Sequence, residues 1–163
     1  MVHFVGAGCG APDLITLRGR RLLEEADVIV YAGSLVTPAL LGFAKKDCRI
    51  YNSAQMTLEE VIAVMEEAES RQQMTVRLHT GDPSLYGAIR EQIDRLKEQK
   101  IAYDVTPGVS SFCGAAAALD AEYTLPGITH RDYYTNSNHV PAAALDEFYR
   151  LPGKTLCSII TRM

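Results

Sequence analysis

The sequence predicts an α/β fold in which a parallel sheet is flanked by helices on both faces. Short runs rich in β-branched and aromatic residues alternate with longer amphipathic segments, the pattern of strand–helix–strand units. Glycine or proline follows several of the short runs and marks turns that lead into helices. Strands are expected at residues 2–5, 28–31, 49–51, 75–79 and 102–105.

The clearest helix is marked by its first residues. Thr57 stands three positions before Glu60, the spacing of a capping box, in which each side chain accepts a bond from the other residue's backbone N–H. An apolar stripe at helical spacing follows, made of Leu58, Val61, Ile62 and Met65. Other helices are expected to begin near Thr16, at Ser84 and near Ser110.

Beyond residue 126 the pattern weakens. We expect a polar loop at 130–139, a short helix at 141–151 and a last strand at 155–161. The chain is therefore divided into a first α/β domain, residues 1–126, and an atypical segment, residues 127–163.

Composition and charge argue against several classes of partner. The formal net charge is −4 and no basic stripe is present, so nucleic acid is not expected to bind. No apolar stretch reaches the ~20 residues of a membrane span, and the N-terminus lacks a signal-peptide pattern. The widely spaced cysteines favour reduced thiols in a cytoplasmic protein and predict no metal site: Cys9, Cys48, Cys113 and Cys157.

The loop after the first strand contains Gly6, Gly8 and Ala11, which loosely match a dinucleotide-binding fingerprint. Two features count against that interpretation. Pro12 follows where a helix should already have begun, and the end of the second strand, at Tyr31, carries no acidic residue for a ribose. A glycine turn without function is the simpler alternative.

The loop after the fourth strand runs Thr80-Gly81-Asp82-Pro83-Ser84. Gly81 permits a ligand to approach the backbone, and Asp82 offers a charge to a cation or a ribose hydroxyl. With Ser84 as a helix cap, free N–H groups would face a ligand carboxylate. An ordinary polar turn explains this loop equally well when it is taken alone.

The loop after the fifth strand runs Thr106-Pro107-Gly108 and leads to the hydroxyl pair Ser110 and Ser111. Helix capping is the simplest role for these serines. The carboxyl ends of parallel strands meet at one edge of a sheet, so the three loops are expected to converge there. Their convergence predicts a cleft for a nucleoside-like ligand.

These motifs resemble, in their order along the chain, those of the tetrapyrrole methylase superfamily. The resemblance is carried by residues 5–16, 31–36, 80–87 and 107–111 and covers about residues 2–126. Residues 51–60, read with 31–36 and 79–89, are most similar to precorrin-4 and cobalt-precorrin-4 carbon-11 methyltransferases. Cys9 stands where the family usually has proline, and Ala11 where it usually has aspartate.

The resemblance implies an enzyme that transfers the methyl group of S-adenosylmethionine to a tetrapyrrole substrate in cobalamin biosynthesis, as a homodimer of two-domain chains. The second α/β domain is then truncated in this chain. The motifs assign the cofactor to these residues: Cys9, Thr80, Gly81, Asp82, Leu85, Ser110 and Ser111.

The resemblance assigns no catalytic residue. His79, Asp82 and Tyr86 are the titratable groups nearest to the expected cleft, and none of them is singled out as a general base. Two alternatives stay open: a non-catalytic remnant or dimerisation module of the family, and a dinucleotide-binding oxidoreductase.

Overall fold

A computed structural model of the chain describes residues 1–123 and divides it into two units, Met1–Ser111 and a second that starts at Phe112. The first unit is built on a five-stranded sheet of order β3-β2-β4-β1-β5. All neighbouring strands pair in parallel. The strands are β1 (Val2–Gly6), β2 (Val28–Tyr31), β3 (Arg49–Asn52), β4 (Thr75–His79) and β5 (Tyr103–Thr106). The five strands predicted between residues 2 and 105 are confirmed, with ends that differ by at most one residue.

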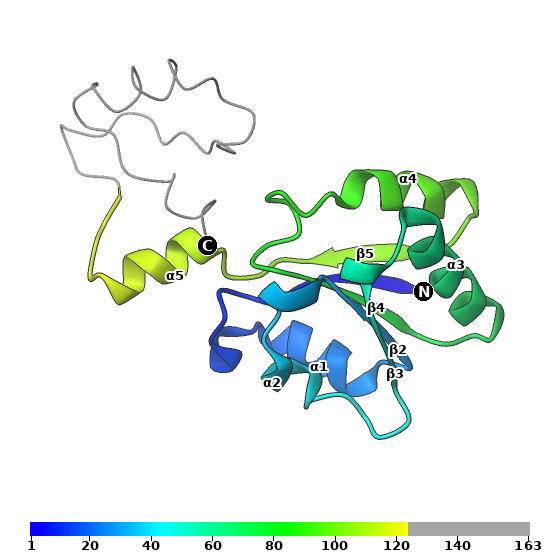
Figure 1. Ribbon diagram of the computed structural model, residues 1–163, viewed down its shortest axis with the longest axis horizontal. Coiled ribbons are helices and arrows are strands. Elements are labelled where there is room, and N and C mark those ends of the chain that lie inside the picture. The colour runs from blue at the N-terminus through cyan, green and yellow to red at the C-terminus, as the bar shows by residue number, and fades with distance from the viewer. Residues whose placement is uncertain (124–163) are drawn as a thin grey trace, which may run out of the picture. The chain divides into compact units, whose positions relative to one another are not determined.

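Helices cover both faces of this sheet, as predicted (Figure 1). One face packs against α1 (Leu17–Glu25) and α2 (Pro38–Leu41), with a core that includes Leu23, Ile29 and Leu40. The other face packs against α3 (Leu58–Ser70) and α4 (Ile89–Glu98), with a core that includes Phe4, Met65 and Leu96. Three single-turn 3-10 helices complete the unit: η1 (Pro12–Leu14), η2 (Gly33–Leu35) and η3 (Ser53–Gln55).

Two helix starts lie where the sequence predicts them. The Thr16 hydroxyl accepts a hydrogen bond from the N–H of Gly19 and caps α1. At α3 the capping box is complete, because Thr57 Oγ1 accepts from the N–H of Glu60 and the Glu60 carboxylate accepts from the N–H of Thr57. Both caps satisfy backbone donors that the helix itself leaves free.

Replacing Thr57 with alanine is expected to lower the free energy of unfolding by about 1 kcal/mol, because the cap loses its acceptor for the Glu60 N–H. Urea unfolding followed by circular dichroism measures the change. Replacing Thr37 with alanine is the matched control, because Thr37 precedes α2 without forming a side-chain cap bond. Equal losses for both variants would contradict the capping role.

The predicted start of α4 at Ser84 is wrong. Residues 83–86 form a turn, and the helix begins only at Ile89. The N–H and the hydroxyl of Ser84 both donate to the Asp82 carboxylate, and Tyr86 and Ala88 adopt left-handed backbone angles, with φ of 57° and 49°. Side-chain capture by an aspartate favours a turn over a helix. No helix therefore starts at Ser84, and the free N–H groups of a helix start predicted there for a ligand carboxylate are not present.

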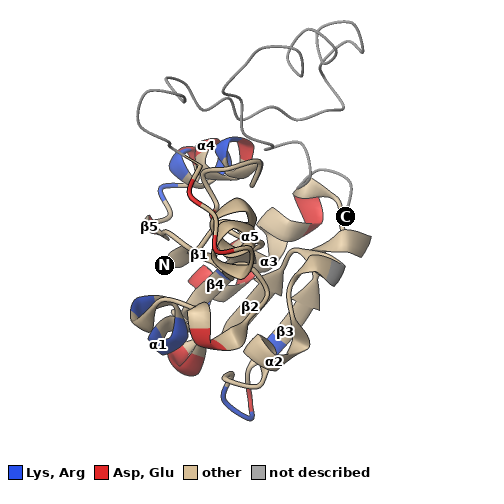
Figure 2. Cartoon of the chain, turned by 90° about the vertical axis from the view of Figure 1, so that its left-hand side faces the viewer, with Lys and Arg blue, Asp and Glu red and all other residues tan. Residues whose placement is uncertain are grey.

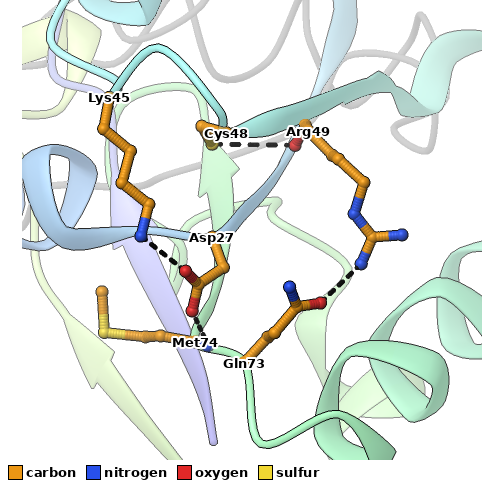
Figure 3. A network of polar contacts seen from close by, with 6 residues as sticks. All are labelled: Asp27, Lys45, Cys48, Arg49, Gln73 and Met74. Atoms are coloured by element: carbon orange, nitrogen blue, oxygen red, sulfur yellow. Dashed lines mark hydrogen bonds and ion pairs between the residues drawn. The ribbon is translucent and has the colours of Figure 1, made fainter.

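The amino end of the sheet is held by a polar network (Figure 3). Asp27 accepts hydrogen bonds from the Lys45 ammonium and from the N–H of Met74, 2.7 Å away. Nearby, Arg49 donates to the Gln73 side chain at 2.7 Å. The Lys45 hydrogen bond, followed by that of Met74, holds the pKa of Asp27 below its usual value. The network joins the starts of β2, β3 and β4, at the edge opposite the three loops.

The second unit is described only as far as Tyr123. Helix α5 (Ser111–Ala118) confirms the prediction of a helix near Ser110, and the Tyr123 hydroxyl donates to the carbonyl of Phe112 at 2.7 Å. The predicted loop at 130–139, helix at 141–151 and strand at 155–161 lie outside the described residues.

Basic and acidic residues both occur on α1 and on α4 (Figure 2). In residues 1–123, every helix is too short or too polar to cross a membrane. The same residues contain no group of three or more His, Cys, Asp or Glu side chains suited to hold a metal ion.

Candidate functional site

The carboxyl ends of β1 and β4 mark the point where the chain changes faces. The connection after β1 leads to α1 on one face of the sheet, and the connection after β4 leads to α4 on the other (Figure 1). Loops that diverge in this way open a crevice between neighbouring strands, which is where α/β sheets bind their ligands. The sequence-predicted loops lie at this point.

The loops after β1 and β4 are joined through their backbones. The N–H of Gly8 donates to the carbonyl of Gly81 at 3.2 Å, and the N–H of Gly81 donates to the carbonyl of Gly8 at 3.0 Å. One step earlier, Ala7 N–H donates to the carbonyl of His79 at 2.6 Å. The two glycines have φ of 79° and 58°, which other residues rarely adopt. A short antiparallel bridge therefore joins the two loops.

The loop after β5 packs against the same glycines. A Cβ atom placed on Gly108 would lie 2.2 Å from the Gly81 carbonyl oxygen and 2.8 Å from the Cα of Gly6. A Cβ atom on Gly6 would lie 2.6 Å from Gly108 backbone atoms. Only hydrogen fits between these three backbones. All three loops thus meet in direct contact.

The Asp82 side chain links the loop after β4 to the loop after β5 through hydrogen bonds. One carboxylate oxygen accepts from the N–H of Ser84 at 2.8 Å and from the Ser84 hydroxyl at 2.5 Å. The other accepts from the N–H of Gly108 at 3.0 Å. Burial raises the pKa of Asp82, but the hydrogen bonds from Ser84 and Gly108 outweigh it and hold the pKa below its usual value. The carboxylate is ionised at neutral pH.

The Asp82→Asn variant tests this role. The new amide has one acceptor oxygen where the carboxylate has two, so its NH₂ group would face either the N–H of Ser84 or that of Gly108, and that donor loses its acceptor. We expect a loss of about 1–3 kcal/mol in the free energy of unfolding at pH 7. Urea denaturation measures the change, with Asp47→Asn, at an exposed position away from the loops, as the control. An Asp82→Asn variant with an unchanged free energy of unfolding would show that the hydrogen bond to Gly108 does not stabilise the fold.

Two buried polar groups at the carboxyl end of the sheet have no hydrogen-bond partner within the described residues. They are Nε2 of His79, a residue 3% exposed, and Oγ1 of Thr106, 2% exposed. Burial, with a smaller contribution from the charge of Arg77, lowers the pKa of His79 to about 3. His79 is therefore neutral at pH 7, and its ring stacks on Phe4 with centroids 6.1 Å apart.

Comparison with known proteins places this geometry in a family. The family model of the tetrapyrrole (corrin/porphyrin) methylases matches residues 1–150. This match extends farther along the chain than the motifs quoted above. The chain belongs to the tetrapyrrole methylase family.

Relatives and solved structures agree with that family. The cobalt-precorrin-4 C(11)-methyltransferase of Methanocaldococcus jannaschii is 56% identical over 128 residues, which are 78% of this chain and 49% of that protein. The X-ray structure of a cobalt-precorrin-4 methyltransferase matches with a TM-score of 0.80 and 41% identity, over 86% of this chain and 60% of that one. The chain thus spans about half the length of the curated relatives it matches.

A third match was solved with a bound ligand. The uroporphyrin-III C-methyltransferase of Thermus thermophilus, complexed with S-adenosylhomocysteine, aligns with a TM-score of 0.66 and 31% identity. The alignment covers 80% of this chain and 56% of that structure.

The structure brings together several of the residues predicted to hold the methylase cofactor. Gly81 lies beside Ser110, since a Cβ on Gly81 would be 3.6 Å from the Ser110 Cα. Cys9 follows the bridging Gly8, and Thr80 precedes Gly81, both partly exposed. The remaining predicted residues lie on the same loops: Asp82 in the contacts given above, Leu85 at the turn where its N–H donates to the Asp82 carbonyl, and Ser111 at the start of α5.

The geometry of the first loop does not match the fingerprint of a dinucleotide-binding oxidoreductase. Helix α1 begins at Leu17, well after Gly6 and Gly8, and of the N–H groups in its first turn that of Gly19 donates to the Thr16 hydroxyl. In the dinucleotide fingerprint, those N–H groups would face the pyrophosphate. The turn η1 at Pro12–Leu14 separates the glycines from the helix.

Sequence reasoning missed three features of this site. The contact of Gly108 with Gly6, the bond between Asp82 and Gly108, and the late start of α4 all depend on how loops meet. The dipeptide Pro107-Gly108 was a signal for a turn but not for a contact. The left-handed Tyr86, which is 61% exposed, had no sequence signal.

Proposed function

We propose that this chain is the S-adenosylmethionine-binding part of a methyltransferase that acts on carbon 11 of precorrin-4 or cobalt-precorrin-4 in cobalamin biosynthesis. The observation that carries the proposal is the junction of three loops at the carboxyl ends of β1, β4 and β5, held by the Gly8–Gly81 bridge and the Asp82–Gly108 bond. The names and identities of the matched relatives support the reaction class.

The residues at the junction fit this cofactor. A Cβ on Gly10 would meet nothing within 4 Å, so the first loop borders open space. The Asp82 carboxylate places a negative charge beside the loops, which suits a sulfonium cation. The residues proposed to hold the cofactor are Cys9, Thr80, Gly81, Asp82, Leu85, Ser110 and Ser111. When bound, the cofactor supplies an electrophilic methyl group.

The chain's own contribution to the reaction is positioning. Methyl transfer from a sulfonium needs an aligned donor and acceptor, and alignment alone lowers such barriers substantially. The buried, neutral His79 and the low-pKa Asp82 are both poor bases, so neither is assigned a proton-transfer role. The proposed role of the close-packed glycine junction is to hold the donor in one orientation.

Exposed arginines are proposed to attract the carboxylates of the tetrapyrrole. Arg20 donates to Glu24 at 2.8 Å and lies over the Phe43 ring, and Arg90 donates to Asp94 at 3.0 Å. Arg18 and Arg21, on the same helix as Arg20, form no ion pair within residues 1–123 and are the better candidates. For the whole protein we propose a homodimer, as the family resemblance implies, and a cytoplasmic location, as the widely spaced cysteines indicate.

Calorimetric titration of the 163-residue chain tests the cofactor assignment. S-adenosylhomocysteine is expected to bind with one site per chain, and NAD, NADH and FAD are expected not to bind. Preference for a dinucleotide would refute the assignment and favour the oxidoreductase alternative.

A second candidate function is binding without catalysis. It is favoured by Cys9 and Ala11, which stand where the family usually has proline and aspartate. Transfer of labelled methyl groups to precorrin-4 distinguishes the two: turnover supports the methyltransferase, whereas cofactor binding with no turnover supports the non-catalytic member of the family.

A further inference from the structure

A buried arginine lies in the centre of the sheet, away from the residues assigned to the cofactor. Arg77 is in the middle of β4, is 6% exposed and has no carboxylate partner within residues 1–123. Burial lowers the pKa of its guanidinium to about 10, so the group still carries its charge at pH 7. An unpaired buried charge is costly, and its presence in a core calls for a role that an apolar side chain does not fill.

Arg77 links the sheet to helix α4. Its Nη1 donates to the carbonyl of Val30 in β2 at 3.1 Å, and its Nε donates to Oε1 of Gln92 at 2.9 Å. Gln92 is itself 5% exposed and lies in the first turn of α4. Its Nε2 donates to the carbonyl of Ala88 at 3.2 Å. A chain of hydrogen bonds thus runs from β2 through Arg77 and Gln92 to Ala88.

Ala88 is the residue at which the loop after β4 ends. It has φ of 49° and ψ of 35°, and no side chain caps the helix there. Two residues earlier Tyr86 is also left-handed, with φ of 57°. Left-handed angles in residues other than glycine are unfavourable and persist only where surrounding contacts fix them. The bond from Gln92 to the Ala88 carbonyl is such a contact.

We propose that Arg77 and Gln92 act as positioning residues that fix the end of the Thr80–Ala88 loop in the conformation that binds the cofactor. We call the link from Arg77 through Gln92 to the Ala88 carbonyl the brace. The identity of the ligand in this inference rests on the proposed function, whereas the brace itself does not. Arg77 holds the Gln92 amide in one orientation, and the amide then holds the Ala88 carbonyl. The loop is thereby tied at both ends, to Gly8 at Gly81 and to the core at Ala88. Neither residue is a catalytic residue.

The Gln92→Glu variant separates positioning from folding. Glutamate keeps the side-chain length and still accepts from Arg77, but it has no N–H₂ to donate to Ala88. We expect the thermal midpoint of the 163-residue chain to stay within about 3 °C. The dissociation constant for S-adenosylhomocysteine is expected to rise about fivefold to tenfold, the scale of one lost hydrogen bond. Gln99→Glu, on the exposed end of the same helix, adds the same charge and is expected to change neither value.

Amide hydrogen exchange of the ligand-free chain gives the second readout. Exchange of residues 81–88 is expected to accelerate in Gln92→Glu and in Gln92→Leu, and to remain unchanged in Gln99→Glu. Unchanged exchange and unchanged affinity in Gln92→Glu would overturn the brace, and so would loop exchange that accelerates only together with that of β4. If the unsubstituted chain binds no S-adenosylhomocysteine, the proposed function fails, while the exchange of the loop still decides the brace.

Discussion

The Gly108→Ala variant is expected to lose about 3 kcal/mol or more of unfolding free energy, at the upper end of the cost of overpacking. The added methyl would lie 2.2 Å from the carbonyl oxygen of Gly81 and 2.8 Å from the Cα of Gly6. These are backbone atoms of β1 and of the loop after β4, so no rotamer change relieves the contact. The loops must separate, and their separation stretches the bond from Gly108 to Asp82.

Urea unfolding at pH 7 measures this loss, and the affinity for S-adenosylhomocysteine is expected to fall with it. Gly42→Ala is the matched control, because Gly42 has φ of −67°, an angle that alanine adopts readily, and lies at the end of α2. A Cβ there would lie 3.2 Å from one carbonyl oxygen, which requires only a small adjustment. If Gly108→Ala were no more damaging than Gly42→Ala, the three loops would not be in the contact described.

The second large effect is a loss of stability on mild acidification, caused by His79. Its pKa is lowered from 6.5 to about 3 in the folded chain, so below pH 6.5 the unfolded chain binds a proton that the folded chain does not. The stabilisation that the neutral His79 contributes is therefore fully present above pH 6.5 and is lost progressively as the pH falls toward 3. The slope is about 1.4 kcal/mol per pH unit, which gives a loss on the order of 3 kcal/mol between pH 7 and pH 4.5.

The His79→Phe variant isolates this contribution. Phenylalanine also has a ring that can stack on Phe4, but it has no nitrogen that could bind a proton. Urea unfolding of both chains at pH 7, 6, 5.2 and 4.5 is expected to give a shallower decrease for the variant, by roughly 1 kcal/mol or more per pH unit. Asp27 and Asp82, whose pKa values are lowered, stabilise the fold above their unfolded value of 3.8 and lose that effect only at lower pH. Parallel pH profiles for the two chains would show that His79 titrates normally in the folded state.

The fold and the helix starts at Thr16 and Thr57 follow from short-range patterns. A strand needs only a run of suitable residues, and a capping box needs only two residues three positions apart, so both are visible along the chain. The start of α4 was mispredicted because Leu85, Ala88 and Ile89 are apolar residues at helical spacing, which extends the pattern of the helix to a point before its true first residue. The Asp82 side chain takes the N–H of Ser84, and this local competition outweighs the helical pattern.

By itself, the sequence determined a parallel α/β sheet, the positions of its strands and the three loops, and a resemblance to the tetrapyrrole methylases. The strand order β3-β2-β4-β1-β5, the close contact of Gly6, Gly81 and Gly108, and the buried link from Arg77 to Ala88 were decided only by the tertiary structure. The physical reason is range. Periodicity and capping act between residues a few positions apart, whereas the separation of two backbones or the partner of a buried charge exists only after distant segments have packed.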